Sequence, residues 1–249
     1  MTAAGRPGRL IGVGVGPGDP ELLTLKALRL IRQTQVIAWP APDEGDSFAR
    51  GVVARFLDEG KTEIAIRVPM RADRRPAQAV YDEAATRIAA HLAAGDDVVV
   101  LCEGDPFFFG SFMYLHERLA GRFAVEVVPG VTSLVAVAAA TGRPLAARND
   151  ALAVIPAPLP DERIAGLLDG ADAAAIVKLG RHLPRIARLL GGLGLDKQAV
   201  YAERVTLAHQ RVLPLAEAGN GDAPYFSMIL VYKGAEPWIA RLPVGGGAS

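Results

Sequence analysis

The sequence predicts a two-domain α/β protein whose first domain holds a parallel sheet covered on both faces. Short apolar runs typical of buried strands alternate with segments of helical periodicity, which is the pattern of such a sheet. The 249 residues suit two modest domains, and 51% hydrophobic residues can bury a sizeable core. Glycine, proline and two arginines over 142–149 are typical of a linker, so we place the domains at 1–142 and 149–249.

Each element follows from apolar spacing and from the residues that interrupt it. Leucines at helical spacing predict the first helix, Gly95 ends the third, and Pro40 closes the second strand. Strands are expected at 9–16, 36–38, 62–68, 97–102, 125–128, 152–155, 174–179, 199–202 and 228–232. Helices are expected at 21–33, 48–57, 77–94, 111–119, 132–141, 163–168 and 184–193.

Charge and composition exclude several classes of protein. The 27 Lys and Arg residues balance 27 Asp and Glu residues, which disfavours a nucleic-acid partner, because such domains usually carry a basic excess. Cys102 is the only cysteine, which excludes an internal disulfide and fits a reducing cytoplasm. Neither a signal-peptide core nor an apolar run of about 18 residues occurs, so we expect a cytoplasmic protein without membrane spans.

A glycine-rich loop joins the first expected strand to the first expected helix. It reads GVGVGPGDP over 12–20, and its glycines let the backbone approach a ligand closely. A dinucleotide-binding GxGxxG motif fails in both frames, because Pro17 or Asp19 stands where the third glycine is required. The Rossmann-like methyltransferase loop also fails, because Gly12 and Trp39 occupy the places of its two carboxylates. A plain tight turn would explain the glycines but not the LLTLKA series that follows.

A second loop, CEGDPFFFGS over 102–111, follows the strand expected at 97–102. Ligands of open parallel sheets bind outside the carboxyl ends of the strands, so a ligand is expected near this loop. Gly104 permits an unusual backbone angle, and Asp105 starts a turn. The three successive phenylalanines could stack on adenine or on a flat macrocycle, or they could plug a domain interface.

A third turn, VPGVTS over 128–133, lies between a strand and a helix. Its hydroxyl residues Thr132 and Ser133 stand where N-cap residues are favoured, so either could cap the helix. All three loops therefore follow strand ends of the first domain.

Together these segments resemble the tetrapyrrole methylase family. Its members open on GxGPGDPxLLTxKA, matched here over 14–27, and continue with a GDPxxxG loop and a PG(I/V)(T/S)S turn. Further segments that resemble edges of the family's cofactor site are 177–182, 201–206 and 224–228. The resemblance runs over 10–234, and the string at 102–115 is most similar to the branch that methylates precorrin-2 at C-20.

The resemblance implies a fold, a cofactor and a reaction. The second domain should hold a mixed sheet, and S-adenosylmethionine should lie folded in a cleft between the domains, held mainly by backbone groups. The reaction implied is methyl transfer to C-20 of precorrin-2, giving precorrin-3A in cobalamin biosynthesis, by a homodimer. Residues implied to bind the cofactor are Pro17, Gly104, Asp105, Phe108, Thr132, Ser133, Leu179, Val205, Phe226 and Ser227.

Methyl transfer from a sulfonium to an enamine-like ring carbon requires alignment and exclusion of water rather than a strong nucleophile. No GxSxG or HExxH motif and no Cys/His pair with ligand-like spacing occurs, and we expect no metal. A base must remove the ring proton after transfer, and Asp105 and Glu103 are the candidates, with Glu203 third. Asp105 could instead cap its own turn, and Glu103 stands where many relatives have glycine.

Precorrins carry acetate and propionate arms, whose carboxylates match the bidentate fork of arginine. Candidate partners are a loop cluster and two residues near the domain junction, namely Arg71, Arg74, Arg75, Arg148 and Arg204. Solvated surface charge is the usual alternative for any one of them.

The substrate leaves alternatives open. The ring could carry cobalt, as in cobalt-factor II, or be another tetrapyrrole, because neither requires a metal ligand from the protein. More distant alternatives are an RNA or protein methylase of the superfamily and a non-catalytic nucleotide-sensing module.

Overall fold

The chain folds as two compact units, Met1–Thr132 and Ser133–Ser249. The computed structural model describes residues 6–68 and 75–240, and each unit has its own sheet and hydrophobic core. The boundary precedes helix α5 (Ser133–Thr141). Contacts therefore group this helix with the second unit, whereas the sequence pattern places it at the end of the first domain.

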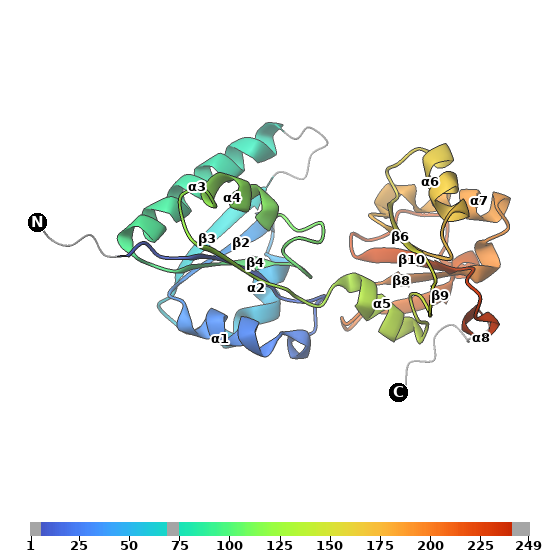
Figure 1. Cartoon of the computed structure of the whole chain (residues 1–249), viewed down its shortest axis with the longest axis horizontal. Helices are drawn as coiled ribbons and strands as arrows, with labels where there is room; N and C mark the ends of the chain where they lie inside the picture. Colours follow the sequence, from blue (N-terminus) through green and yellow to red (C-terminus); the bar gives the residue numbers. More distant parts are fainter. Residues whose placement is uncertain (1–5, 69–74, 241–249) are drawn as a thin grey trace, which may run out of the picture. The chain divides into compact units, whose positions relative to one another are not determined.

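Within the described residues, the first unit holds a five-stranded, entirely parallel sheet in the order β3-β2-β4-β1-β5. Its strands are β1 (Leu10–Gly14), β2 (Val36–Pro42), β3 (Thr62–Val68), β4 (Val98–Cys102) and β5 (Val125–Val128). Its helices are α1 (Leu25–Gln33), α2 (Phe48–Val53), α3 (Arg75–Ala94) and α4 (Phe112–Leu119). Helices α1 and α2 cover one face of the sheet and α3 and α4 cover the other (Figure 1), which confirms the predicted parallel sheet.

Side chains of the central strands alternate between two cores, as the pleat of a strand requires. In β1, Ile11 and Val13 join the core under α1 and α2, whereas Leu10 joins the core under α3 and α4. Gly12 lies on the same face as Leu10, and a Cβ there would be 2.6 Å from the ring of the fully buried Phe112. The first glycine of the loop motif therefore makes room for α4 to pack on the sheet.

Strand β2 continues through Pro40 to Pro42 and is longer than predicted. Its pairing with β4 ends at Ala38, and beyond that point β2 pairs, within the described residues, with β3 alone. Proline has no N–H to donate and is tolerated where one side of a strand has no neighbour. The proline signal therefore marks the end of pairing on one side and not the end of the strand.

The described part of the second unit also holds five strands, in the order β6-β7-β10-β8-β9. They are β6 (Leu152–Pro156), β7 (Ala173–Val177), β8 (Ala199–Glu203), β9 (Arg211–Pro214) and β10 (Ser227–Tyr232). Strands β6 and β7 are parallel and the other pairs are antiparallel, so the sheet is mixed, as the resemblance implies. Helices α6 (Asp161–Asp169) and α7 (Leu183–Gly192) pack on one face, while α5 and α8 (Pro237–Ala240) lie on the other (Figure 1).

Two strands of this unit differ from the prediction. Strand β9 was not predicted, because it has four residues and a half-buried pattern too short to show alternation. Strand β7 ends at Val177 rather than at Leu179, because Lys178 adopts φ 59° and turns the chain out of the extended conformation.

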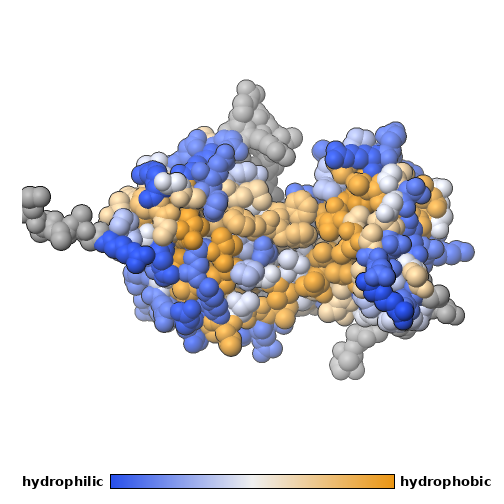
Figure 2. Space-filling model, viewed as in Figure 1, coloured by the Kyte–Doolittle hydropathy of each residue, from blue (hydrophilic) through white to orange (hydrophobic). Residues whose placement is uncertain are grey.

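Hydrophobic residues also reach the surface of both units, as Figure 2 shows for the face in view. Large exposed ones include Leu25, Phe107 and Phe109 in the first unit and Tyr225 and Trp238 in the second. Among the helices that the structure describes, none is long and apolar enough to cross a membrane.

Replacing Gly12 by alanine should destabilise the protein by about 1–3 kcal/mol, because the added methyl overlaps the Phe112 ring in a closely packed core. Urea unfolding monitored by circular dichroism measures this free energy. Gly121→Ala is the matched control, since a Cβ at Gly121 meets no atom within 4 Å. Equal unfolding midpoints for the two variants would contradict the proposed role of Gly12.

Candidate functional site

Three loops of the first unit meet at one edge of its sheet. They follow β1, β4 and β5, and β1 lies between the other two strands. Because the three strands are parallel, their carboxyl ends lie at the same edge, which is where ligands of open α/β sheets bind. The loops predicted from sequence are thus brought together by the strand order.

Backbone groups hold the first and second loops side by side. Gly16 N donates to Gly104 O at 3.3 Å, and Gly104 N donates to Gly16 O at 2.9 Å. The third loop approaches just as closely, since a Cβ on Gly130 would be 2.1 Å from Gly104 O and 2.8 Å from Gly14 Cα. Only residues without a Cβ at Gly14 and Gly130 allow this approach.

The carboxylate of Asp105 ties the second loop to the third. Its Oδ1 accepts the N–H groups of Phe107 at 2.9 Å and Phe108 at 3.1 Å, and its Oδ2 accepts Gly130 N–H at 3.1 Å. Asp105 therefore caps its own turn, one of the roles left open by the sequence, and it also fixes the turn after β5. Thr132 is half-buried and lies close to Gly104. Its Cα is 3.8 Å from the point where a Cβ on Gly104 would stand.

The three phenylalanines of the second loop do not share one environment. Phe107 and Phe109 are each 48% exposed, and Phe108 is half-buried with its ring edge-on to that of Phe109. Phe109 has φ 57°, an uncommon angle for a residue with a side chain, and the rigid turn capped by Asp105 precedes it. The loop thus holds two aromatic rings partly in solvent next to the meeting point of the backbones.

Glu103 lies in the same loop, directly after β4. Its side chain is half-buried, and burial raises the pKa of its carboxyl above the ordinary value. Among the residues that the structure describes, this carboxyl has no hydrogen-bond or ion-pair partner. A carboxyl in such a setting holds its proton more readily than an exposed one.

Other reactive side chains of the described chain are not grouped for metal chemistry or attack. Cys102 is buried in the core of the first unit, and desolvation raises the pKa of its thiol, so the nucleophilic thiolate is disfavoured. Across residues 6–68 and 75–240, no three His, Cys, Asp or Glu side chains form a group that could hold a metal ion.

The predicted cofactor residues of the second unit lie at strand ends. Leu179 is fully buried in the core under α6 and α7, and Val205 is 7% exposed. Phe226 is half-buried, and buried Ser227 donates its hydroxyl to Pro224 O at 2.6 Å. Leu179 as a whole residue therefore has no exposed surface. Ser133, the first residue of α5, is exposed.

The candidate arginines fall into three settings. Arg71 and Arg74 lie outside the described residues, as does the side chain of Arg75 at the start of α3. Arg148 is exposed, has φ 49° and pairs with Glu236 at 2.7 Å. Arg204 also has a positive φ and pairs with buried Glu203, the third candidate base, in a cluster that also includes Arg211.

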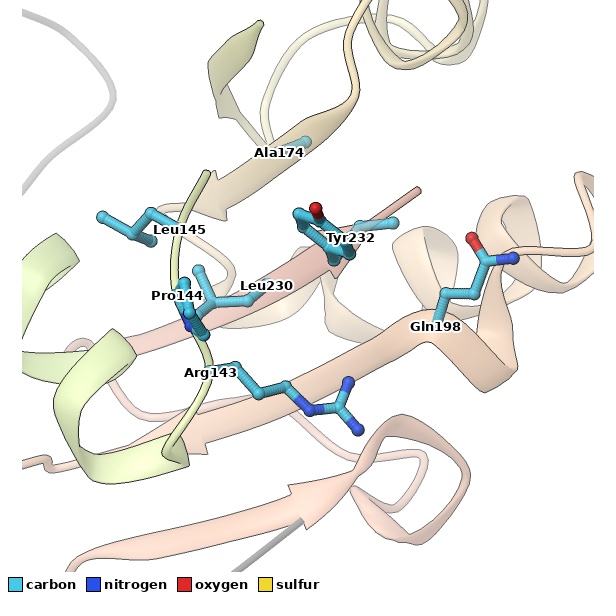
Figure 3. Close-up of a pocket in the computed structure, with 8 residues that line it drawn as sticks. Arg143, Pro144, Leu145, Ala174, Gln198, Leu230 and Tyr232 are labelled. Carbon is cyan, nitrogen blue, oxygen red and sulfur yellow. The ribbon is translucent and has the colours of Figure 1, made fainter. Parts of the chain in front are cut away.

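A small pocket lies within the second unit, between the segment after α5 and the sheet (Figure 3). Its lining includes Arg143 and Leu145 from that segment, Ala174 from β7, and Leu230 and Tyr232 from β10. Its volume of about 10 Å³ suits one water molecule, so it is too small for a nucleoside or a macrocycle. Arg143 is 6% exposed and is therefore an interior residue, and this burial lowers the pKa of its guanidinium group.

Comparison with known proteins gives concordant results. The family Tetrapyrrole (Corrin/Porphyrin) Methylases matches residues 9–219. The chain is 42% identical over 232 residues to a precorrin-2 C(20)-methyltransferase of a Sinorhizobium species, covering 90% of this chain and 95% of that protein. It is 34% identical over 229 residues to a cobalt-precorrin-2 C(20)-methyltransferase of Salmonella typhimurium, covering 91% and 97%.

The fold is similar to that of a solved relative of lower identity. The uroporphyrin-III C-methyltransferase of Thermus thermophilus, crystallised with S-adenosylhomocysteine, gives a TM-score of 0.68 at 27% identity, covering 94% of this chain and 99% of that one. This structural similarity and the sequence identities to the two methyltransferases agree with the family predicted from the loop motifs. The chain therefore belongs to the tetrapyrrole methylase family.

Proposed function

We propose that the chain transfers a methyl group from S-adenosylmethionine to C-20 of precorrin-2, giving precorrin-3A in cobalamin biosynthesis. The observation that carries this proposal is the meeting of three glycine-containing turns at one sheet edge, where backbone hydrogen bonds join the first turn to the second and Asp105 joins the second to the third. Support for the substrate comes from the full-length likeness to the Sinorhizobium precorrin-2 C(20)-methyltransferase. The protein is expected to act in the cytoplasm and as a homodimer, with no nucleic-acid or membrane partner.

The backbone geometry fits a cofactor that is bound largely by main-chain groups. Gly14 and Gly130 allow no Cβ, so a ligand at this edge can approach bare backbone. We assign its binding to the residues named from sequence, with Pro17, Gly104, Asp105, Phe108 and Thr132 in the first unit. Ser133, Leu179, Val205, Phe226 and Ser227 would contribute from the second. When bound, S-adenosylmethionine supplies a methyl group on a positively charged sulfur.

The two acidic residues of the second loop receive different roles. The carboxylate of Asp105 accepts three backbone N–H groups, so its main role is to position the loops. Glu103 has no polar partner among the described residues, and burial raises the pKa of its carboxyl, which makes its carboxylate a stronger base. Glu103 is therefore the stronger candidate for removing the ring proton.

A cobalt-containing ring is the second candidate substrate. The specific observation that favours it is the 34% identity to the cobalt-precorrin-2 enzyme of Salmonella typhimurium. The higher identity to the metal-free counterpart favours precorrin-2 itself.

Anaerobic incubation with S-adenosylmethionine and either precorrin-2 or cobalt-precorrin-2, followed by mass spectrometry and NMR of the product, tests the proposal. The expected result is gain of one methyl group at C-20 with the metal-free ring. Preference for the cobalt ring would support the second candidate. Binding of S-adenosylhomocysteine without turnover of either ring, or methylation of RNA or protein, would overturn both.

Gly130→Ala should lower kcat/KM about 100-fold. The added methyl group would lie 2.1 Å from Gly104 O, so the second and third loops would have to move apart. Steady-state kinetics and calorimetric titration with S-adenosylhomocysteine measure the effect. Gly51→Ala in α2, where a Cβ meets nothing within 4 Å, is the matched control and should leave both quantities unchanged. Wild-type affinity in Gly130→Ala would contradict a cofactor site at this edge.

Substitutions in the two carboxylates should have separable effects. Glu103→Gln should lower kcat by about 10²- to 10⁴-fold, the typical contribution of a general base, and leave the Kd of S-adenosylhomocysteine unchanged. Asp105→Asn should raise that Kd, because the new amide N–H would face the N–H of Gly130. Wild-type kcat in Glu103→Gln would remove Glu103 from the mechanism.

The raised pKa of Glu103 also predicts a pH dependence of stability. The folded state favours the protonated carboxyl, so this stabilisation is complete below the unfolded-chain pKa and is lost as the pH rises through the folded-state value. Glu103→Gln carries no such proton. Its free energy of unfolding, measured relative to the wild type by urea titration from about pH 4 to pH 8, should therefore increase with pH. Parallel curves for the two proteins would contradict the burial effect.

A further inference from the structure

A buried carboxylate in the second unit binds two arginines at once. Glu203, the last residue of β8, is 4% exposed. Its Oε1 lies 3.1 Å from Arg204 Nη1 and 3.3 Å from Arg211 Nη1, and its Oε2 accepts the hydroxyl of Tyr201 at 2.5 Å. Burial and the adjacent carboxylate raise the pKa of Tyr201, so the hydroxyl keeps its proton and donates it.

The cluster carries one more positive charge than its glutamate requires. One arginine would be sufficient to compensate a buried carboxylate, yet both guanidinium groups reach the same oxygen. The side chains of Arg204 and Arg211 are 44% and 53% exposed, so each guanidinium has one side in solvent. Within the described residues, their remaining N–H donors have no acceptor. The arrangement presents a fixed surplus of donors and charge to an anion.

The backbone around Arg204 is held in an uncommon conformation. Arg204 and Thr206 have φ 49° and 72°, while Val205 between them is buried. Left-handed backbone in a β-branched residue is rare and persists only where the surroundings enforce it. Hydrogen bonds from Arg204 N to Phe226 O at 2.8 Å and from Thr206 N to Gln210 Oε1 at 2.9 Å fix the turn. Arg211 is aligned independently, because its register partner across β8 and β9 is Glu203.

We propose that Arg204 and Arg211 form one binding site for a carboxylate of the substrate, with Glu203 and Tyr201 as positioning residues. The inference rests on the proposed function, since it takes the ligand to be a tetrapyrrole that carries acetate and propionate arms. Arginine suits this ligand because its planar fork matches a carboxylate, and because pre-aligned donors lose little freedom on binding. Glu203 is thereby occupied and does not act as the ring base.

Arg211→Gln tests the site without changing the turn that holds Arg204. The expected result is a rise of about tenfold to a hundredfold in the KM for precorrin-2, the usual loss for a hydrogen bond to a charged group, with little change in kcat. The Kd of S-adenosylhomocysteine should stay at its wild-type value. Arg211→Lys keeps the charge but not the planar fork, so its KM for precorrin-2 should lie between those of the wild type and Arg211→Gln. Arg188→Gln is the matched control, an exposed arginine of α7 outside the cluster, and should behave as the wild type.

A double variant, Arg204→Gln with Arg211→Gln, tests whether the two side chains serve one carboxylate. The combined loss should be smaller than the product of the single losses, because either substitution alone disrupts the shared contact. A wild-type KM in Arg211→Gln, or an equal loss of S-adenosylhomocysteine affinity, would overturn the site. If the wild-type protein does not methylate precorrin-2, the proposed function is refuted instead. Assaying the wild type therefore distinguishes failure of the proposed function from failure of the carboxylate site.

Discussion

The carboxylate of Asp105 is the contact on which the geometry of the candidate site depends. It accepts N–H groups from its own loop and from Gly130, and so holds the ends of two strands that are separated in the sheet by β1. The glycines around it act in the same direction, because a Cβ at Gly14 or Gly130 would force the three loops apart. The three sequence motifs thus act together, because each allows the backbones of the three loops to approach one another closely.

This arrangement suits a reaction that needs alignment more than chemical activation. Burial raises the pKa of the Cys102 thiol, which disfavours the nucleophilic thiolate. A nucleophilic ring carbon and a sulfonium methyl require placement in line and exclusion of water. A rigid set of backbone turns with partly exposed aromatic rings beside it can provide such placement, and Glu103 adds a carboxyl that can accept a proton.

The two units use different means to place polar groups. In the first unit, the parallel strands β1, β4 and β5 direct the loops that follow them to one edge, so the backbone itself forms the candidate site. In the second unit, antiparallel pairing aligns Arg211 with Glu203 across neighbouring strands, and side chains form the polar cluster. A buried glutamate, a tyrosine and a strained turn there hold two guanidinium groups in position.

The sequence by itself determined the alternation of strands and helices, the three loop motifs and the family, because these depend on local apolar spacing and on contiguous residues. It could not determine that β2 passes through Pro40, since this depends on which neighbour a strand lacks on one side. Nor could it show that the carboxylate of Asp105 also accepts the N–H of Gly130, which lies 25 residues away in the chain. The Glu203 cluster likewise depends on register between two strands, one of them too short to be predicted. Long-range pairing and burial are properties of the tertiary structure, and they decided what each of these residues contacts.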